Sequence, residues 1–374
     1  MQSRLKPPFR ADHVGSLLRP RAVLDARDRH ARGEITAAEL RKAEDDGIRD
    51  VVGLQAEIGL KAVTDGEFRR RHWFLDFLEK IEGVAVRSCL PVKFHNEAGE
   101  KDLAPPVLHV DGRLRRTVGL ATDDFAFLRS ATPAGCVAKQ TVPSPTIVHF
   151  RGGRAAIDRA AYPDLDGFFA DLARVYREEI AALGALGCRY LQIDDTNLAL
   201  LCDPALRADV TARGDDPDAL PHVYARLINE SIKDRPADMA VGLHLCRGNH
   251  ESSWIAEGGY EPVAEAMFNE IAVDAFFLEY DSPRAGDFRP LRFVPRGRKI
   301  VLGLVTTKKP TLESKDTLKR RIDEAAKYVP LDQLCLSPQC GFASTLKGNA
   351  LTVEDEKAKL RLVVETAEEV WGRG

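Results

Sequence analysis

Ala240-Val241-Gly242-Leu243-His244-Leu245-Cys246 is the stretch that decides the fold. It is short and mostly apolar, as expected of a strand that is buried on both faces of a parallel sheet. Segments with helical spacing precede it at Leu220–Ile232 and follow it at Pro262–Ile271. A helix, a buried strand and a second helix in succession are typical of a protein built from βα units.

The same alternation extends along the chain in both directions. The predicted strands are His13–Ser16, Lys61–Gly66, Gly135–Thr141, Arg189–Asp194, Ala240–Cys246, Ala275–Tyr280, Lys299–Leu304 and Gln333–Ser337. The predicted helices lie near Thr36–Ile58, Phe74–Ile81, Leu165–Leu183, Leu220–Ile232, Pro262–Ile271 and Glu313–Tyr328, with a last one after Thr352. This alternation favours an α/β fold with a single (β/α)8 TIM barrel, formed by residues 1–374 as one domain, over a doubly wound sheet.

One stretch interrupts the alternation. Residues 84–118 contain two extended runs, at Pro91–His95 and Pro105–Val110, separated by a turn rich in Gly, Glu and Lys. Two such runs around a turn predict a hairpin. We therefore expect a hairpin inserted between the second and third βα units.

The composition excludes several classes of partner. The 374 residues carry 54 basic and 57 acidic side chains, with a net charge of -3, so no electrostatic footprint for nucleic acid or an anionic membrane is present. The N-terminus lacks the apolar stretch of a signal peptide, and no run of 18 apolar residues occurs. We expect a cytoplasmic protein that binds a small molecule, with its seven cysteines as free thiols or ligands.

Four candidate metal ligands follow apolar runs. His244 and Cys246 alternate with leucines, so strand periodicity sends both side chains toward the same side at the carboxyl end of their strand. Glu279 ends the next strand, and Cys340 comes shortly after Pro338. The carboxyl ends of barrel strands form the active face. We therefore expect these four side chains to meet there.

Imidazole, thiolate and carboxylate are ligands that zinc accepts. Ligands from three strands differ from the local knots of structural zinc, and a barrel needs no metal to fold, so the pattern predicts a catalytic Zn²⁺ site. The alternative is that both cysteines are ordinary core residues and that Glu279 pairs with an arginine such as Arg284. His250 competes for the metal, although no strand periodicity points it inward.

A second group consists of Ser16, Glu67 and Asp194, which also lie at predicted strand ends. A hydroxyl and two carboxylates beside a thiol-binding metal would hold the ammonium of an amino-acid substrate, because a buried cation needs anionic partners. The alternative is that Glu67 and Asp194 form internal salt bridges with Arg69–Arg71 or Lys139.

These motifs resemble the cobalamin-independent methionine synthase family, specifically its C-terminal catalytic barrel. The resemblance spans nearly the whole chain and rests on His13-Val14-Gly15-Ser16, Asp65-Gly66-Glu67, Gln192-Ile193-Asp194-Asp195, His244-Leu245-Cys246 and Ser337-Pro338-Gln339-Cys340-Gly341. The His-x-Cys pair with a downstream Glu, together with the Pro-x-Cys-Gly element, is its specific part.

The resemblance implies a (β/α)8 barrel that uses zinc to activate homocysteine and transfers a methyl group to its sulfur, commonly from 5-methyltetrahydrofolate polyglutamate. By matching position, it implies zinc on His244, Cys246, Glu279 and Cys340. It implies homocysteine contacts from Ser16, Glu67 and Asp194.

Three departures from the family pattern concern the rest of the reaction. Full-length members carry an additional N-terminal barrel, so we expect this chain to resemble the short single-barrel relatives. The family's proton-handling His falls within Leu304–Lys308, where no His occurs, and a folate-stacking Trp is replaced near His149-Phe150. The proton-handling residue therefore stays unassigned, and the donor stays open between folate, a methylated corrinoid or other methyl-carrier protein, and a methylsulfonium compound.

Two other classes of function remain open. A zinc thiol alkyltransferase resembling epoxyalkane:coenzyme M transferase would keep the metal and take a sulfonate thiol, for which Arg69–Arg71 would be better suited than Asp194. A non-catalytic zinc-binding protein would have a closed metal site.

Overall fold

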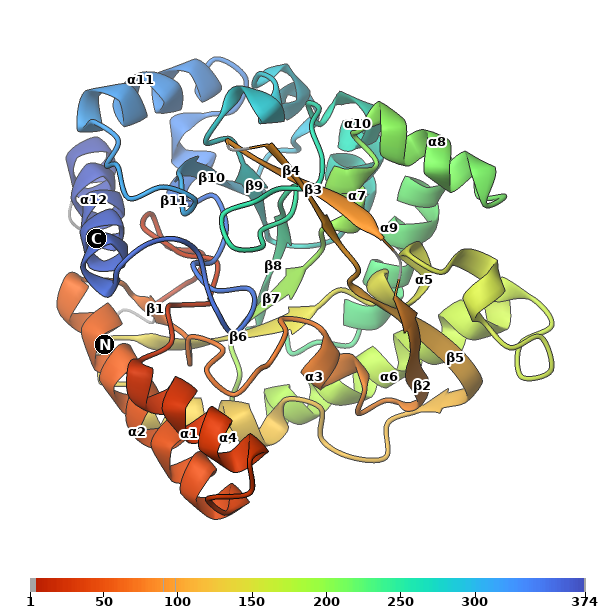
Figure 1. The fold of residues 1–374 in the computed structure, drawn as a ribbon. Helices are drawn as coiled ribbons and strands as arrows, with labels where there is room; N and C mark the ends of the chain where they lie inside the picture. Colours follow the sequence, from red (N-terminus) through yellow and green to blue (C-terminus); the bar gives the residue numbers. More distant parts are fainter. Residues whose placement is uncertain (1–4, 90, 98, 373–374) are drawn as a thin grey trace.

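A curled parallel sheet of seven strands forms the centre of the molecule in the computed structural model (Figure 1). The structure describes residues 5–89, 91–97 and 99–372. The spatial order of the strands is β1–β6–β7–β8–β9–β10–β11. Their bounds are β1 Ala62–Val63, β6 Val137–Pro143, β7 Tyr190–Asp194, β8 Ala240–Leu245, β9 Ala275–Glu279, β10 Lys299–Val305 and β11 Leu334–Pro338. The chain therefore has an α/β, TIM-barrel-like fold.

The parallel register brings the carboxyl ends of the strands to one edge of the sheet. Asp194 at the end of β7 pairs with His244 near the end of β8. Glu279 at the end of β9 pairs with Gly303 of β10. Polar side chains far apart in the sequence are thus placed together by the register alone.

The N-terminal segment differs from the prediction. The structure assigns no strand to His13–Ser16; instead Ala11 forms one isolated parallel bridge with Leu336 of β11. On the other side, His13 Nε2 lies 3.2 Å from the Ala62 carbonyl oxygen. Gly15, at φ 132°, leaves the strand conformation immediately afterwards. The predicted first strand is therefore wrong, although the segment does run between β11 and β1.

Helices cover the outside of the sheet. The longer ones are α1 Arg21–Ala31, α2 Ala37–Ile58, α4 Thr122–Ala131, α6 Leu165–Ala185, α8 Pro204–Ala212, α9 Leu220–Ile232, α10 Glu261–Glu270, α11 Lys315–Ala325 and α12 Val353–Trp371. The short ones are α3 Leu75–Leu78, α5 Ile147–Phe150 and α7 Asn197–Leu200. Thr352 caps α12 through a reciprocal capping box with Asp355, as expected for a helix beginning after Thr352.

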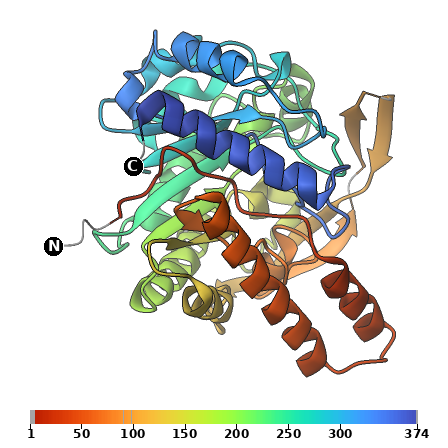
Figure 2. The same ribbon diagram turned by 90° about the vertical axis from the view of Figure 1, so that its left-hand side faces the viewer.

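The last helix packs beside the N-terminal segment (Figure 2). The Arg10 guanidinium lies 5.5 Å from the centre of the Trp371 ring, and the Leu18 amide donates to the Glu356 carboxylate at 2.8 Å. These contacts tie the beginning of the described chain to its end. They hold the N-terminal segment in place where a regular strand is not formed.

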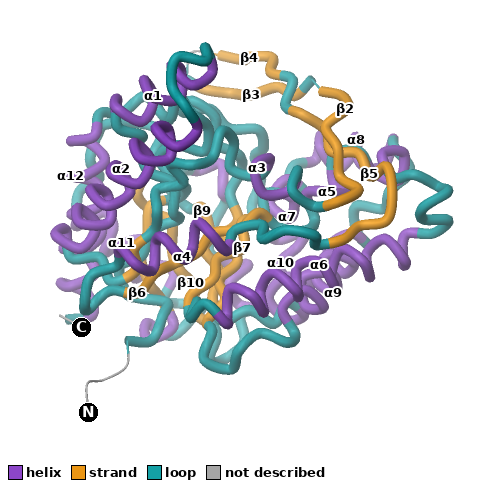
Figure 3. The backbone as a smooth tube through the Cα atoms, turned by 90° about the horizontal axis from the view of Figure 1, so that it is seen from below, coloured by secondary structure: helices purple, strands orange, loops and turns teal. Residues whose placement is uncertain are grey.

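Two antiparallel strand pairs lie between β1 and β6 in the sequence. β2 (Glu82–Cys89) pairs with β5 (Pro106–Arg115), and β3 (Val92–Asn96) pairs with β4 (Gly99–Leu103). The β3–β4 hairpin stands apart from the central sheet (Figure 3). The backbones of His95 and Trp254 exchange hydrogen bonds of 2.7 and 2.9 Å, which fasten this hairpin to the loop after β8.

The core has two parts. Leu191, Leu243 and Leu278 point toward the helices and are fully buried in a large apolar cluster. Inside the sheet, Lys139 pairs with Asp12 at 2.9 Å, and both side chains are buried. From the sequence, Lys139 was one of the possible salt-bridge partners of Glu67 or Asp194. In the structure its ion pair is with Asp12.

The helices lack the character of membrane spans. Within residues 5–89, 91–97 and 99–372, no helix combines the length and apolar character needed to cross a membrane.

Candidate metal and substrate site

A cavity of about 240 Å³ lies at the carboxyl edge of the sheet. Ends of β1, β7, β8 and β11 contribute its polar side chains, and the β3–β4 hairpin contributes apolar ones such as Phe94 and Leu103. Partly apolar walls with a few converging polar groups are typical of small-molecule sites.

Three of the four predicted metal ligands meet in this cavity. The ligand atoms of His244, Cys246 and Cys340 all lie within 4.8 Å of one another, and all three residues are buried. The two sulfurs are 3.6 Å apart. Two thiolates on one tetrahedral zinc, with bonds of about 2.3 Å, would be separated by roughly 3.8 Å. The spacing therefore suits a shared metal.

His244 is oriented as metal-bound histidines are. Its Nδ1 lies 3.0 Å from Asp194 Oδ1, whereas its Nε2 is buried and has no hydrogen-bond partner. A carboxylate on one ring nitrogen fixes the tautomer and leaves the other nitrogen available to a metal. An orphaned buried nitrogen beside two sulfurs is an independent sign that a group fits here.

The two thiols share their proton unequally. Hydrogen bonding with Cys246 holds the pKa of Cys340 well below its ordinary value, and the same interaction with Cys340, followed by burial, raises the pKa of Cys246. Cys340 is therefore the more acidic thiol of the pair. Cys136, Cys188, Cys202 and Cys335 are free thiols outside this cluster.

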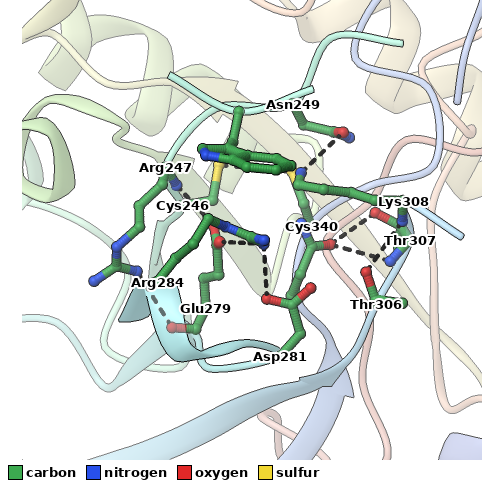
Figure 4. Close-up of polar contacts among 12 residues, drawn as sticks. Cys246, Arg247, Asn249, Glu279, Asp281, Arg284, Thr306, Thr307, Lys308 and Cys340 are labelled. Atoms are coloured by element: carbon green, nitrogen blue, oxygen red, sulfur yellow. Dashed lines mark hydrogen bonds and ion pairs between the residues drawn. The ribbon is translucent and has the colours of Figure 1, made fainter. Parts of the chain in front are cut away.

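Glu279 lies beside this cluster and outside the group of three (Figure 4). It is fully buried, and its Oε2 accepts a hydrogen bond from the Arg247 amide at 2.7 Å. Its Oε1 lies 3.4 Å from Arg284 Nη2. The pairing with Arg284 considered from the sequence is thus present.

The three predicted substrate contacts, Ser16, Glu67 and Asp194, all line the same cavity. Glu67 Oε1 contacts Arg70 Nη1 at 3.1 Å, while Oε2 is buried without a hydrogen-bond partner. Burial raises the pKa of Glu67 to about 7. Glu67 itself has φ 61°, a strained value for a non-glycine residue that aims its side chain inward.

The segment after Cys340 packs directly on Ser16. The Phe342 amide donates to the Ser16 carbonyl oxygen at 2.8 Å. A Cβ at Gly341 would lie 1.9 Å from the Ser16 hydroxyl oxygen, so a side chain there would force Ser16 to move. This close approach couples the position of Cys340 to that of Ser16.

The arginine run considered for a sulfonate substrate is engaged elsewhere. Arg69 pairs with Asp45, Arg70 with Glu67, and Arg71 with Asp76. None of the three arginines lines the cavity.

His250 does line the cavity, but it lies outside the cluster of possible ligands. Its ring contacts that of Phe94 in the β3–β4 hairpin, with ring centres 5.5 Å apart and planes tilted by 57°. The preference for His244 over His250 as a ligand therefore agrees with the geometry.

Sequence reasoning missed Lys308. Lys308 follows β10, in the segment where the resemblance places a His that this chain lacks, and its side chain is buried. Its Nζ donates to the Gly248 carbonyl oxygen at 3.1 Å and to Asn249 Oδ1 at 3.3 Å (Figure 4). Its charge helps to lower the pKa of Glu279, against the effect of burial. A lysine a few residues past an apolar strand was the available signal.

A family model described as the catalytic domain of cobalamin-independent synthase matches residues 9–369. The chain belongs to this family. The match covers every segment on which the resemblance to the cobalamin-independent methionine synthases rests.

Relatives differ in how they are named. The uncharacterized protein YxjH of Bacillus subtilis is 47% identical over 378 residues, covering 99% of this chain and 97% of YxjH. The methionine synthase of Pyrococcus abyssi is 25% identical over 334 residues, covering 88% of this chain and 85% of that protein. A solved structure from Listeria monocytogenes, named as a candidate vitamin-B12-independent methionine synthase, is 40% identical with a TM-score of 0.78, covering 99% of this chain and 100% of that one.

Proposed function

We propose that this chain is a zinc-dependent methyltransferase that transfers a methyl group to the thiol of homocysteine and forms methionine. The observation that carries the proposal is a single cavity lined by the His244–Cys246–Cys340 cluster and by the Glu67 and Asp194 carboxylates. A thiolate site and an ammonium site in one cavity match the two ends of homocysteine. Membership of the family and a relative named methionine synthase support the same function.

The residues present fit zinc. His244 would bind through its orphaned Nε2, Cys246 and Cys340 through their sulfurs, and Glu279 would be the fourth ligand. When bound, zinc would supply a Lewis acid that keeps the acceptor thiol deprotonated at neutral pH.

The chain's own residues position the acceptor. Asp194 orients His244 and, with the free Oε2 of Glu67, offers negative charge to the ammonium. The Arg70 guanidinium partly neutralises Glu67, which lowers the cost of burying two carboxylates near each other. Ser16 adds a hydroxyl on the wall formed with Gly341.

We also propose that residues 1–374 act as a single (β/α)8 barrel. The N-terminal segment around Ala11, held between β11 and β1, would take the place of the eighth strand. Residues 84–118 would then be an insertion that covers the cavity.

The proposed donor is 5-methyltetrahydrofolate, its polyglutamate or another methyl carrier. The test is a donor panel with zinc-loaded protein and L-homocysteine, using 5-methyltetrahydrofolate, its triglutamate, a methylated corrinoid protein and S-methyl-L-methionine. Methionine is measured by mass spectrometry, with Cys340→Ala as the inactive control. Methionine formed by the wild type with one donor supports the function, and no methionine with any donor contradicts it.

Metal content tests the site separately. We expect about one zinc per wild-type chain and much less in Cys340→Ala. Cys335→Ala is the matched control, because Cys335 is an equally buried thiol outside the cluster. Wild-type protein without stoichiometric zinc would remove the metal from the proposal.

The two alternative classes have their own readouts. Coenzyme M bound in preference to homocysteine would favour the sulfonate alkyltransferase, although the arginines considered for it lie outside the cavity lining. A cobalt-substituted protein whose spectrum does not respond to any added thiol would favour a non-catalytic zinc protein.

A further inference from the structure

Arg151 is a cation without an anion. Among the described residues that line the cavity, it is the only arginine or lysine. Its Nη1 is shielded from solvent and has no hydrogen-bond partner. The described chain forms no ion pair with it, in contrast to Arg70 with Glu67 and Arg284 with Glu279.

The surroundings hold Arg151 in place without satisfying it. Its guanidinium lies over the Phe74 ring, 5.6 Å from the ring centre, which contributes a modest cation–π attraction. Burial lowers the pKa of Arg151 to about 10, so the group still carries its charge at neutral pH. A charged group that is largely buried and unpaired is costly for the folded protein.

A second unsatisfied group lies on the same wall. His72 is shielded from solvent at Nδ1, which has no hydrogen-bond partner, and its ring contacts Phe74 with centres 4.4 Å apart. Burial, followed by the nearby charge of Arg151, lowers the pKa of His72 to about 3. The ring is therefore neutral and can donate one hydrogen bond without adding a second charge.

We propose that Arg151, assisted by His72, binds a carboxylate of the small molecule that occupies the cavity. A single guanidinium in partly apolar surroundings matches a monoanion better than a phosphate dianion. Glu67 and Asp194 also line the cavity, but neither pairs with Arg151 in the described chain and burial is the only cause of the shift in its pKa. The cavity therefore offers separate places for the positive and negative ends of a ligand. The inference deepens the proposed function and rests on it.

Two sources supply a carboxylate: the acceptor homocysteine and a methyl donor that carries one. The test compares ligands with and without this group by calorimetry on the zinc-loaded protein. The acceptor pair is L-homocysteine and 3-aminopropane-1-thiol. The donor pair is S-methyl-L-methionine and (3-aminopropyl)dimethylsulfonium. Each pair is measured with wild type, Arg151→Gln, Arg151→Lys and the control Arg71→Gln, since Arg71 is an exposed arginine outside the cavity.

We expect Arg151→Gln to weaken binding of the carboxylate-bearing member of one pair by about tenfold to a hundredfold. The member without a carboxylate should bind almost unchanged. Arg151→Lys should restore part of the preference, and Arg71→Gln should behave as wild type. The pair that loses its preference identifies the source of the carboxylate.

An unchanged carboxylate preference of both pairs in Arg151→Gln would overturn the inference, as would a wild type that shows no carboxylate preference in either pair. Methionine formation is a separate readout. An enzyme that makes methionine but keeps its carboxylate preference without Arg151 would retain the proposed function and lose the anion site. A protein that makes no methionine but whose carboxylate preference depends on Arg151 would keep the anion site and lose the proposed function.

Discussion

Asp194 serves two neighbours at once. Its Oδ1 accepts from Gln192 at 2.7 Å and lies 3.0 Å from His244 Nδ1, while its side chain also lines the cavity. One carboxylate therefore orients a proposed metal ligand and offers charge to a substrate. Glu67 reaches the same cavity without contacting His244 through any hydrogen bond of the described chain, so the two carboxylates are separable by substitution.

We predict that Asp194→Asn and Glu67→Gln give different patterns. Both substitutions should lower the affinity for L-homocysteine by about tenfold or more, because each removes a negative charge from the site proposed for the ammonium group. Asp194→Asn should also lower the affinity for zinc by about tenfold to a hundredfold, since it alters the hydrogen bond that orients His244. Zinc affinity is measured by competition with a chelator. Equal zinc affinity in both variants would contradict the double role of Asp194.

A pH profile tests Glu67 more directly. Because burial raises its pKa to about 7, Glu67 becomes neutral as the pH falls through 7 and loses its attraction for an ammonium. We expect L-methionine, which has no thiol proton to release, to bind more weakly at pH 6 than at pH 8. In Glu67→Gln the affinity should be lower and nearly independent of pH over this range. A pH dependence that survives in Glu67→Gln would assign it to another group.

Helices and strands were easier to predict from the sequence than the contacts between them. Apolar runs such as Ala275–Glu279 predict strands because both faces are buried, and the structure has strands at seven of the predicted positions. The first failed because Gly15 turns the chain out of the extended conformation. The buried Asp12 side chain bonds to Lys139 of β6, and His13 Nε2 lies against the Ala62 carbonyl oxygen of β1. Residues 84–118 form two antiparallel pairs where one was expected.

The candidate site follows the same division. The two-residue period of a strand predicts that His244 and Cys246 lie on the same side, because this period depends only on local sequence. The position of Glu279 depends on Arg247 and Arg284, which approach it from the segments that follow β8 and β9. Arg151 was not singled out, because a missing partner is visible only when the whole neighbourhood is in place.

The β3–β4 hairpin is the element whose packing is easiest to test. Phe94 is buried against His250 and joins the hairpin to the loop after β8. We expect Phe94→Ala to speed amide hydrogen exchange in residues 92–103 with little change in the thermal midpoint, because the hairpin lies outside the central sheet. Val86→Ala, at a 40% exposed position on β2, is the control. A large fall in the midpoint would show that the hairpin belongs to the cooperative core.

At the scale of the whole molecule, one buried carboxyl makes stability depend on pH. Burial raises the pKa of Glu356 to about 8, and its carboxylate accepts from the Leu18 amide. The folded chain keeps a proton there that the unfolded chain releases near the ordinary glutamate value of 4.5. Stability from this group is therefore present at low pH and is lost as the pH rises toward 8.

We predict that Glu356→Gln raises the thermal midpoint at pH 8.5 and changes it little at pH 5. Glutamine can still accept from the Leu18 amide but carries no charge to bury. Glu354→Gln, at a side chain that is 77% exposed, is the control and should have little effect at either pH. A midpoint that shifts equally at both pH values would mean that packing, rather than charge, is the cause.

The β3–β4 hairpin beside the cavity has a consequence for the rate of ligand release. It is fastened near its tip by the His95–Trp254 backbone pair and by an ion pair of 3.3 Å between Lys101 and Glu251. We expect release of a ligand seated beneath it to require opening of these contacts, so that the hairpin as well as the ligand's own contacts sets the residence time of the complex. Turnover would then be paced by product escape, and substitutions at the hairpin tip would alter rates while leaving equilibrium affinity almost untouched.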